Sequence, residues 1–345
     1  MPQGSRPPPD PLYVLRAHGA DVTAVCFLQN DLYLASGDVE GKVIIWSMTT
    51  RRPVQKWQAH TSGILAVHQI PCDRLLSHGR DDQLHIWDLS KLESETTDVG
   101  VLLPEFTLLV NSLNFCGAAV LLMPATAETL VAVPGIDENA AIDIYNLTRK
   151  EYHRQGLMVS NAAKDTGLCM CLRMFHVQSG EVLLAAGYES GVVIIWDVQS
   201  GEARQRGKLH EEPVLSLDIA PDASMGVSGG ADTKIVRWRL DTASETRNAA
   251  LEVLGEQTLP ARGTAAVRIR PDGKIVATGS WDSSIRIFSA KTLKPLAVLQ
   301  AHRQNISCLC FAGEGRTAET QMTTTPANML AVGSKDGSIT LWSIY

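Results

Sequence analysis

Apolar and polar positions alternate along most of the chain in short runs, and the runs come in pairs. In each pair, the first run ends at a small residue or glycine, a turn of Gly, Asp and Ser follows, and the second run ends at Trp or Phe. A period of two is typical of half-buried strands, so each pair predicts a β-hairpin. Six copies stand out: SGDVEGKVIIWS (36–47), SHGRDDQLHIWD (77–88), AGYESGVVIIWD (186–197), SGGADTKIVRWR (228–239), TGSWDSSIRIFS (278–289) and VGSKDGSITLWS (332–343).

Four of these hairpins are preceded by a histidine that follows a short strand. His18, His60, His210 and His302 stand 28, 27, 28 and 40 residues before the Trp that ends their hairpins. This spacing is typical of WD40 repeats, in which each repeat supplies one blade of a propeller. The pattern therefore predicts an all-β propeller.

The strand after each histidine position indicates how many blades there are. It carries a small residue followed by a larger aliphatic residue in seven places. Innermost strands converge on the propeller axis, where a bulkier side chain would overpack. The pairs are Ala24 and Val25, Ala66 and Val67, Ser112 and Leu113, Cys171 and Leu172, Ser216 and Leu217, Ala266 and Val267, and Cys308 and Leu309. We therefore expect a seven-bladed WD40 β-propeller.

The two ends of the sequence predict how the ring closes. The segment PLYVLRAH (11–18) has the pattern of an outer strand, and the chain ends at Tyr345 directly after a third strand. We expect the N-terminal strand to complete the C-terminal blade and remove an exposed sheet edge. The domain prediction is a flexible proline-rich start (1–10) and a single propeller (11–345). It includes an irregular blade (101–150) and three insertions (149–164, 242–260 and 313–328), of which the last is either a docking loop or a tolerated insertion.

Composition narrows the function classes. The chain has 345 residues with 31 Lys and Arg against 37 Asp and Glu, a net charge of −6, which argues against a direct nucleic-acid partner. Its apolar stretches are too short to cross a membrane, and its seven cysteines are scattered in apolar strings. Cys171 and Cys308 are expected to fill small holes. We expect a soluble intracellular protein with no metal and no cofactor.

Two sets of residues resemble the buried hydrogen-bonded tetrad of a WD40 blade. A His facing Asp and Ser could also suggest a hydrolase, but a Trp donor would close the chain of hydrogen bonds within one blade. We therefore predict a structural role for both sets and no catalytic residue. The sets are His60, Ser77, Asp81 and Trp87, and His210, Ser228, Asp232 and Trp238.

Binding to other proteins is the remaining function, and propellers bind mainly through the rim around the channel mouth. The residue before the acidic turn position of each hairpin should project there, and Trp281 matches the composition of interface anchors. The candidate partner-binding residues are Arg80, Tyr188, Glu189, His210, Glu211, Glu212, Trp281 and Lys335.

Several blocks of sequence go beyond the repeat. Together they resemble the family of fungal ASTRA-associated protein 1 and its animal counterpart, guanine nucleotide-binding protein subunit beta-like protein 1. The blocks are RPPPDPLYVLRAH (6–18), WSMTTRRPV (46–54), LLSHGRDDQLHIWDL (75–89), MCLRMF (170–175), LLAAGYESGVVIIWDV (183–198), LHEEPVLSLDI (209–219), IRPDGKIVATGSWDSSIRIF (269–288) and SKDGSITLWSIY (334–345).

The resemblance implies a non-enzymatic scaffold of the ASTRA complex, linked to chromatin remodelling. It also implies work with the TTT cochaperone in the stability and assembly of phosphatidylinositol 3-kinase-related kinases, which would be indirect partners. A nuclear location is implied, with a cytoplasmic pool also open, and we expect a monomeric propeller inside a hetero-complex.

Two other functions stay open at this point. One is a signalling adaptor like the G-protein β chain, although such chains need an N-terminal coiled-coil helix, and here a short proline-rich segment precedes the first strand. The other is a substrate receptor of a ubiquitin ligase.

Overall fold

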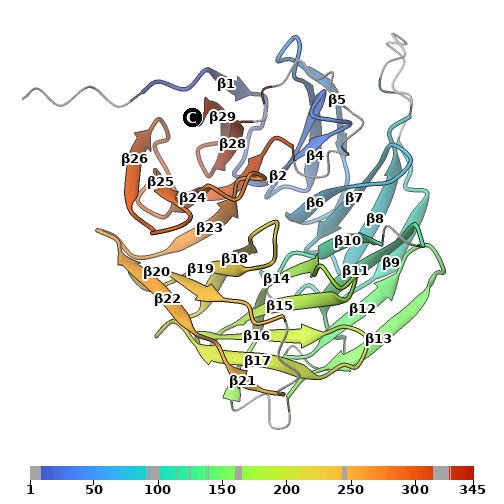
Figure 1. The fold of residues 1–345 in the computed structure, drawn as a ribbon. Helices are drawn as coiled ribbons and strands as arrows, with labels where there is room; N and C mark the ends of the chain where they lie inside the picture. Colours follow the sequence, from blue (N-terminus) through green and yellow to red (C-terminus); the bar gives the residue numbers. More distant parts are fainter. Residues whose placement is uncertain are drawn as a thin grey trace, which may run out of the picture.

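A computed structural model shows the fold of the chain. It describes residues 9–90, 92, 102–113, 115–123, 126–136, 138, 140–159, 165–242, 247–313, 326 and 328–345. In this part of the chain, 29 strands form seven sheets arranged as blades in a ring (Figure 1), which confirms the predicted propeller. The described residues contain no helix with the length and apolar character needed to cross a bilayer.

The strands of each blade run from the channel outward in sequence order. Blade one holds β2 (Val22–Leu28), β3 (Tyr33–Asp38), β4 (Lys42–Ser47) and β5 (Pro53–Gln58). Blade two holds β6 (Ile64–Ile70), β7 (Arg74–Gly79), β8 (Gln83–Asp88) and β9 (Phe106–Leu109). Blade three holds β10 (Ala119–Met123), β11 (Glu128–Pro134), β12 (Ile142–Asn146) and β13 (Glu151–Leu157).

The other four blades follow the same order, except that blade four has a fifth strand and the outer strand of blade seven comes from the start of the chain. Blade four holds β14 (Cys169–His176), β15 (Val182–Tyr188), β16 (Val192–Asp197), β17 (Ala203–Lys208) and the short β21 (Ala249–Ala250). Blade five holds β18 (Val214–Ile219), β19 (Met225–Gly230), β20 (Lys234–Arg239) and β22 (Val253–Thr258). Blade six holds β23 (Thr264–Ile269), β24 (Ile275–Ser280), β25 (Ser284–Ser289) and β26 (Pro295–Gln300). Blade seven holds β27 (Ile306–Phe311), β28 (Met329–Ser334), β29 (Ser338–Ser343) and β1 (Tyr13–Arg16).

The hydrophobic core is divided among the junctions between blades. The buried apolar side chains of the described residues form seven clusters, and each cluster joins two neighbouring blades. At the first junction, Val43 and Ile45 of β4 pack with Val67 and Leu75 of blade two. Because strand residues alternate between the two faces of a sheet, each blade buries one face against each neighbour.

A glycine in the second strand allows neighbouring blades to approach closely. A Cβ atom on Gly37 of β3 would lie 2.5 Å from the side chain of Ile64, the first residue of blade two. Four more pairs repeat this contact around the ring: Gly187 with Val214, Gly229 with Thr264, Gly279 with Ile306, and Gly333 with Val22. The glycine therefore leaves room for the first residue of the next blade, which is β-branched in all five pairs.

The junction between blades two and three is built differently. Blade two has His78 in place of the glycine, and the first strand of blade three begins only at Ala119. His78 Nδ1 accepts a hydrogen bond from the Ala118 backbone N–H at 3.1 Å, and its Nε2 donates to Ser112 Oγ at 3.0 Å. The prediction that Ser112 and Leu113 belong to the innermost strand is thus wrong, and by strand register Gly117 holds the position of the small residue.

The ring closes as the sequence predicts. Strand β1 pairs antiparallel with β29, with Leu15 opposite Ile339 (Figure 1). Leu15 is only 1% exposed and packs in the cluster between blades seven and one. The N-terminal strand therefore covers the edge of the last blade and contributes to its core.

Two of the segments expected as insertions carry strands. The 149–164 segment contains β13, the outer strand of blade three, and the 242–260 segment contains β22, the outer strand of blade five. The second segment also contains β21, which pairs in parallel with β17 of blade four. Most of the expected insertion at 313–328, and all but the last two residues of the expected flexible start at 1–10, lie outside the described residues.

The close approach between blades predicts the effect of a single methyl group. Gly37→Ala should lower the free energy of unfolding by about 1–3 kcal/mol, because the new Cβ would overlap the Ile64 side chain. Gly255→Ala is the matched control, since a Cβ at Gly255 would meet no atom within 4 Å. Urea unfolding followed by tryptophan fluorescence measures both, and equal stability of the two variants would contradict the packing described.

The closure predicts a second effect on stability. Leu15→Ala should lower the free energy of unfolding by about 2–4 kcal/mol, because it leaves a cavity between blades seven and one. Leu12 is 50% exposed, so Leu12→Ala should change the stability by less than about 0.5 kcal/mol. A loss of similar size in the two variants, measured by the same unfolding experiment, would argue against a structural role of β1.

Candidate partner-binding surface

One side of the ring, here called the upper face, is formed by two kinds of connection. They are the turns between the second and third strands of each blade, and the segments that lead from an outer strand into the next blade. A backbone hydrogen bond joins the two kinds in the same way in successive blades: Val39 N donates to Asp21 O at 2.9 Å and Arg80 N to Gly63 O at 2.8 Å. Trp281 and Lys335 make equivalent bonds. The turn residues predicted to project together therefore do lie on one face.

The predicted tetrad of blade two is complete and holds one of these turns in place. His60 Nδ1 lies 2.8 Å from Asp81 Oδ1, and His60 Nε2 lies 2.7 Å from Ser77 Oγ, which also accepts a hydrogen bond from Trp87 Nε1 at 2.8 Å. Asp81 further accepts a bond from the Thr61 backbone N–H. Ser77 is fully buried, so it has no access to a substrate, and the set acts as a cross-link within the blade.

Burial and hydrogen bonding set the charges in this tetrad. Burial lowers the pKa of His60, so the imidazole is neutral at pH 7 and donates from Nδ1. Burial alone would raise the pKa of Asp81, but hydrogen bonds from the Thr61 backbone and from His60 bring it below its usual value. The turn is therefore held by a charged carboxylate that accepts bonds from neutral donors.

The second predicted tetrad, in blade five, lacks its last bond. His210 Nδ1 lies 3.1 Å from Asp232 Oδ2 and His210 Nε2 lies 2.9 Å from Ser228 Oγ. The Trp238 indole N–H has no hydrogen-bond partner within the described part of the chain. Its ring packs against Gly226, where a Cβ would come within 2.2 Å. The expectation of a closed four-residue chain is wrong here, because packing on the glycine sets the position of the indole.

Blade one has a complete tetrad that the sequence analysis missed. His18 contacts Asp38 at 2.8 Å and Ser36 at 2.7 Å, and Trp46 Nε1 donates to Ser36 Oγ at 2.8 Å. The carboxylate comes from the end of β3 and not from the turn position, where Glu40 stands. The Asp that directly follows Ser36 and Gly37 was the signal that could have revealed it.

Tyr188 was expected on the rim, and this prediction is wrong. Its side chain is 1% exposed and belongs to the core cluster between blades three and four. The Trp196 indole donates to the Tyr188 hydroxyl at 3.2 Å. Blade four has no histidine at the usual position, so the phenol takes the acceptor role that Ser77 has in blade two.

In blades six and seven, other side chains hold the turn between the second and third strands. In blade six, buried Arg286 pairs with Asp282 at 2.5 Å, and Phe288 replaces the tryptophan. In blade seven, His302 bonds Asp336 at 3.0 Å and Thr340 at 2.8 Å. Different side chains thus fix the same kind of turn.

Five of the predicted contact residues are accessible on the upper face. Arg80, Glu189, Glu211 and Lys335 are exposed, and Trp281 is 43% exposed with one side of its ring against Gly263.

The remaining predicted contact residues are less accessible to a partner. Glu212 is half-buried and its carboxylate lies 3.4 Å from the guanidinium of Arg262. His210 is 2% exposed and belongs to its blade's hydrogen-bonded set, so the prediction that it contacts a partner is wrong. The acidic pair after His210 therefore presents Glu211 outward and Glu212 toward a basic neighbour.

The structure adds two apolar residues that the sequence analysis did not place there. Leu113 is 74% exposed and Phe115 is 69% exposed, both in the connection that leads into blade three. The guanidinium carbon of Arg80 lies 4.5 Å from the centre of the Phe115 ring, a cation–π contact. Phe115 also lines the central channel. The sequence Gly117-Ala118-Ala119, which supplies the small residues of blade three, would have shown that Leu113 and Phe115 precede the strand.

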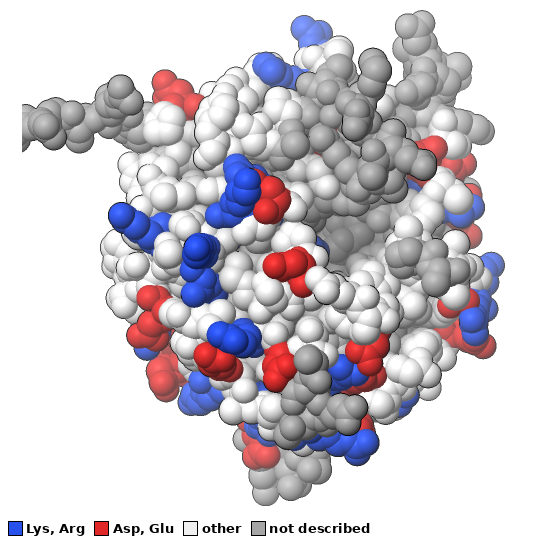
Figure 2. Space-filling model, viewed as in Figure 1, with Lys and Arg blue, Asp and Glu red and all other residues white. Residues whose placement is uncertain are grey.

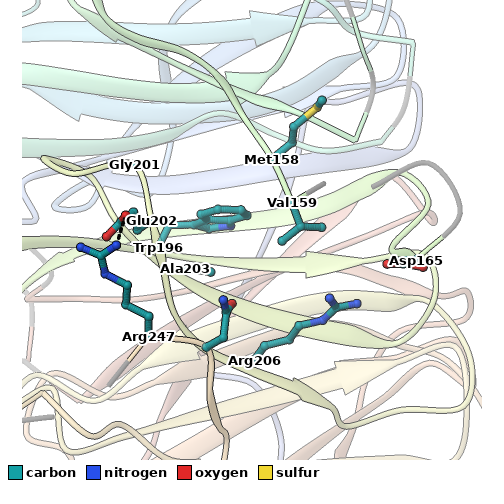
Figure 3. A pocket seen from close by; sticks show the side chains of 10 residues that line it. Met158, Val159, Asp165, Trp196, Gly201, Glu202, Ala203, Arg206 and Arg247 are labelled. Carbon is teal, nitrogen blue, oxygen red and sulfur yellow. Dashed lines mark ion pairs between the residues drawn. The ribbon is translucent and has the colours of Figure 1, made fainter. Parts of the chain in front are cut away.

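A further pocket lies at the outer rim of blade four, where the segment after β13 passes over β17 (Figure 3). Its volume is about 480 Å³. Met158, Val159 and Trp196 form an apolar wall, and Arg247 pairs with Glu202 at 2.5 Å. Among the described residues that line the pocket there is no histidine, serine, cysteine or lysine, so these residues provide no pairing of a nucleophile with a base of the Ser–His type.

Three of the seven cysteines have thiols that stay protonated. Burial raises the pKa of Cys308 to about 12, and it raises the pKa of Cys171 as well. A hydrogen bond with Cys169 and burial raise the pKa of Cys116. Thiols that stay protonated are poor nucleophiles and poor metal ligands. Among the described residues, no group of three or more His, Cys, Asp and Glu side chains could hold a metal ion.

Comparison with known sequences points to one family. The sequence model of the family described as ASTRA-associated protein 1 matches residues 11–325. The chain is 33% identical to ASTRA-associated protein 1 of Verticillium alfalfae, covering 98% of this chain and 93% of that protein. It is also 33% identical to mouse guanine nucleotide-binding protein subunit beta-like protein 1, covering 98% and 97% of the two chains.

Comparison with solved structures supports the fold. The β-propeller domain of Cps50 (Swd1) from Myceliophteria thermophila aligns with a TM-score of 0.74 at 19% identity, covering 96% of this chain and 100% of that domain. At this level of identity the likeness concerns the fold, and it agrees with the ring of seven blades.

The buried histidines of blade two predict a loss of stability in acid. Burial, followed by the charges of His60 and His68, lowers the pKa of His78 to about 3. Its unfolded value is about 6.5, so below pH 6.5 the unfolded chain binds a proton that the folded protein excludes. The contribution of His78 to the free energy of unfolding is therefore complete above pH 6.5. It should fall by up to about 1.4 kcal/mol per pH unit as the pH drops toward 3.

The variant His78→Gln isolates this contribution. Glutamine can replace both hydrogen bonds of the imidazole but takes up no proton, so the slope of unfolding free energy against pH between 6.5 and 4.5 should become shallower by about one proton. Leu12→Ala, which removes no titratable group, is the control that should keep the wild-type slope. The origin assigned to the acid sensitivity is wrong if His78→Gln keeps that slope too.

Proposed function

Because the chain belongs to the ASTRA-associated protein 1 family, we propose that it is a non-enzymatic adaptor that joins the subunits of an ASTRA assembly through its upper face. The family match and the WD40 propeller fold support a scaffold role. The specific assignment of the upper face rests on its exposed anchors.

The observation that carries this assignment is the exposure of two aromatic rings on a rigid frame. Phe115 and Trp281 are 69% and 43% exposed. Near them, the Ser112 backbone N–H donates to Asp82, the Trp281 backbone N–H donates to Gly263 O, and Asp282 pairs with Arg286. A large aromatic side chain held in water loses little conformational entropy on binding and gains much apolar contact, so such residues commonly dominate protein interfaces. The rings are therefore suited to protein partners.

Charge supports the same choice of partner. On the side of the ring seen in Figure 2, basic and acidic side chains both occur, separated by uncharged residues. With a net charge of −6, the protein has little to attract a nucleic-acid backbone. Protein partners fit this surface better than nucleic acid.

Within the assembly, we propose that the partners include the TTT cochaperone proteins, with phosphatidylinositol 3-kinase-related kinases as indirect clients. The chain would then act in the nucleus, in chromatin remodelling and in the maturation of these kinases. Its part would be to hold partners together, because its buried His, Asp and Ser sets have no access to a substrate.

The test is quantitative affinity purification of the tagged full-length protein from its own cells. Wild type should recover ASTRA subunits and TTT proteins. The double variant Phe115→Ala with Trp281→Ala should reduce this recovery about tenfold, the effect expected for loss of interface anchors. Far-ultraviolet circular dichroism and the melting temperature should be unchanged, because both residues are exposed.

Leu296→Ala with Val298→Ala is the matched control. These residues are 54% and 44% exposed on β26 at the outer rim, so their loss removes a similar apolar area elsewhere. Equal recovery by the two double variants would contradict the role of the upper face. Recovery of cullin adaptors in place of ASTRA subunits would contradict the proposed assembly.

A further inference from the structure

The central channel is lined by residues from all seven blades and has a volume of about 240 Å³. A cavity of this size is smaller than a typical pocket for a drug-sized ligand, but it has room for a small ion. Apart from thiols, the ionisable residues of its described lining are His68, Arg173 and Arg268, and no Asp or Glu is among them. The channel wall is therefore basic, although the net charge of the protein is −6.

The basic residues of the channel share one level of the ring. Each stands two residues after the small residue of its innermost strand, so the strand register gives them equivalent positions. One acid, Asp218, stands at the same level, and it is 1% exposed. The seven residues at this level are Cys26, His68, Ala119, Arg173, Asp218, Arg268 and Cys310.

Three of the four polar side chains at this level connect neighbouring blades. His68 Nε2 donates to the Ala118 carbonyl, in the segment that leads into blade three, at 2.7 Å. Arg173 Nε lies 3.0 Å from Asp218 Oδ1 of blade five, and Asp218 Oδ2 accepts a bond from the Ile269 backbone N–H of blade six at 2.8 Å. Asp218 therefore offsets the charge of Arg173 and lies behind the channel wall.

Arg268 differs from these three residues. Its Nη1 donates to the carbonyl of Val267, on its own strand, at 2.8 Å. Within the described part of the chain, Arg268 makes no ion pair and no hydrogen bond to another blade. Because a guanidinium has five N–H donors, most of those of Arg268 remain available to a ligand. Its charge is also poorly screened, since the side chain is half-buried in a narrow channel.

The two guanidiniums act on the same part of the channel. Burial lowers the pKa of His68 to about 4, and the charges of Arg173 and Arg268 add to this shift, while the hydrogen bond to the Ala118 carbonyl opposes it. Burial raises the pKa of Cys308 in blade seven to about 12, and the charge of Arg268 partly opposes that shift. His68 belongs to blade two, which lies across the ring from blade six. The field of Arg268 therefore extends across the channel.

We infer that the central channel binds a small oxyanion of the phosphate type, held by Arg268 and assisted by Arg173. The N–H groups of a guanidinium match pairs of oxygen atoms on such an anion, so Arg268 can donate two hydrogen bonds to it. The anion neutralises the one charge at this level that the protein leaves uncompensated. The inference goes beyond the adaptor function and does not depend on it.

Titration of the isolated full-length protein with inorganic phosphate tests the inference. Isothermal titration calorimetry at pH 7, with ionic strength held constant by sodium chloride, should show saturable binding of one phosphate to wild type. Arg268→Gln should weaken this binding about tenfold or more, the effect of losing charge-assisted hydrogen bonds. Arg268→Lys keeps the charge but not the paired donors, so its affinity should lie between the two.

Arg52→Gln is the matched control. It removes the same charge from an exposed position in the turn between β4 and β5, away from the channel, and should bind phosphate as wild type does. The melting temperature without phosphate shows that each variant is folded. Absence of saturable binding to wild type, or equal affinity of wild type and Arg268→Gln, would overturn the inference.

A crystal soaked with tungstate, a heavier tetrahedral oxyanion, gives the location. Anomalous density should lie in the channel within hydrogen-bond distance of the Arg268 guanidinium. Density at surface cations alone would show that the bound phosphate has a different site and would refute the assignment of the channel.

Discussion

Burial between neighbouring blades is the constraint on which the rest of the structure depends. Each sheet is too thin to enclose a core, and the apolar side chains of its two faces are covered by the blades on either side. No blade can therefore be complete while the ring is open. This explains why a four-residue strand at the start of the chain matters, since β1 both pairs with β29 and fills the junction between the last and first blades.

The polar side chains inside each blade hold the turns of the upper face in place. The carboxylates of buried Asp38 and of half-buried Asp81 and Asp336 accept bonds from histidine and from backbone N–H groups, and these bonds connect the turns to the segments beside them. Blades four and six reach a similar result with Tyr188 and with Arg286. The turns of the upper face are therefore held in place by hydrogen bonds beneath them, and substitutions in these sets would change the shape of that face from below.

The sequence was sufficient to predict the repeat, the number of blades and the closure of the ring, because each depends on local patterns that recur. The count of seven was right even though its third member, Ser112 and Leu113, was misplaced by several residues. Blade three begins late because His78 fills the space that a glycine leaves elsewhere, and no pattern within blade three records that substitution in blade two.

The contact surface was harder to predict than the fold. Arg80 and Trp281 were placed correctly because turn positions are exposed in any blade. Tyr188 was misplaced because its burial results from the missing histidine of blade four, and Phe115 was missed because it lies in the irregular connection that follows blade two. Both errors arise where a blade departs from the regular repeat, so the pattern of the other repeats gave the wrong expectation.

The chain between the outer strands of blades four and five acts as an external clasp. It runs beside β17 in parallel as β21 and then continues as the outer strand of blade five, so two neighbouring sheets share one covalent rim. Mechanical or thermal rupture of the ring would have to peel this rim from both sheets before that junction could part. The same segment covers part of the outer edge of blade four and so shields it from strand exchange with other molecules.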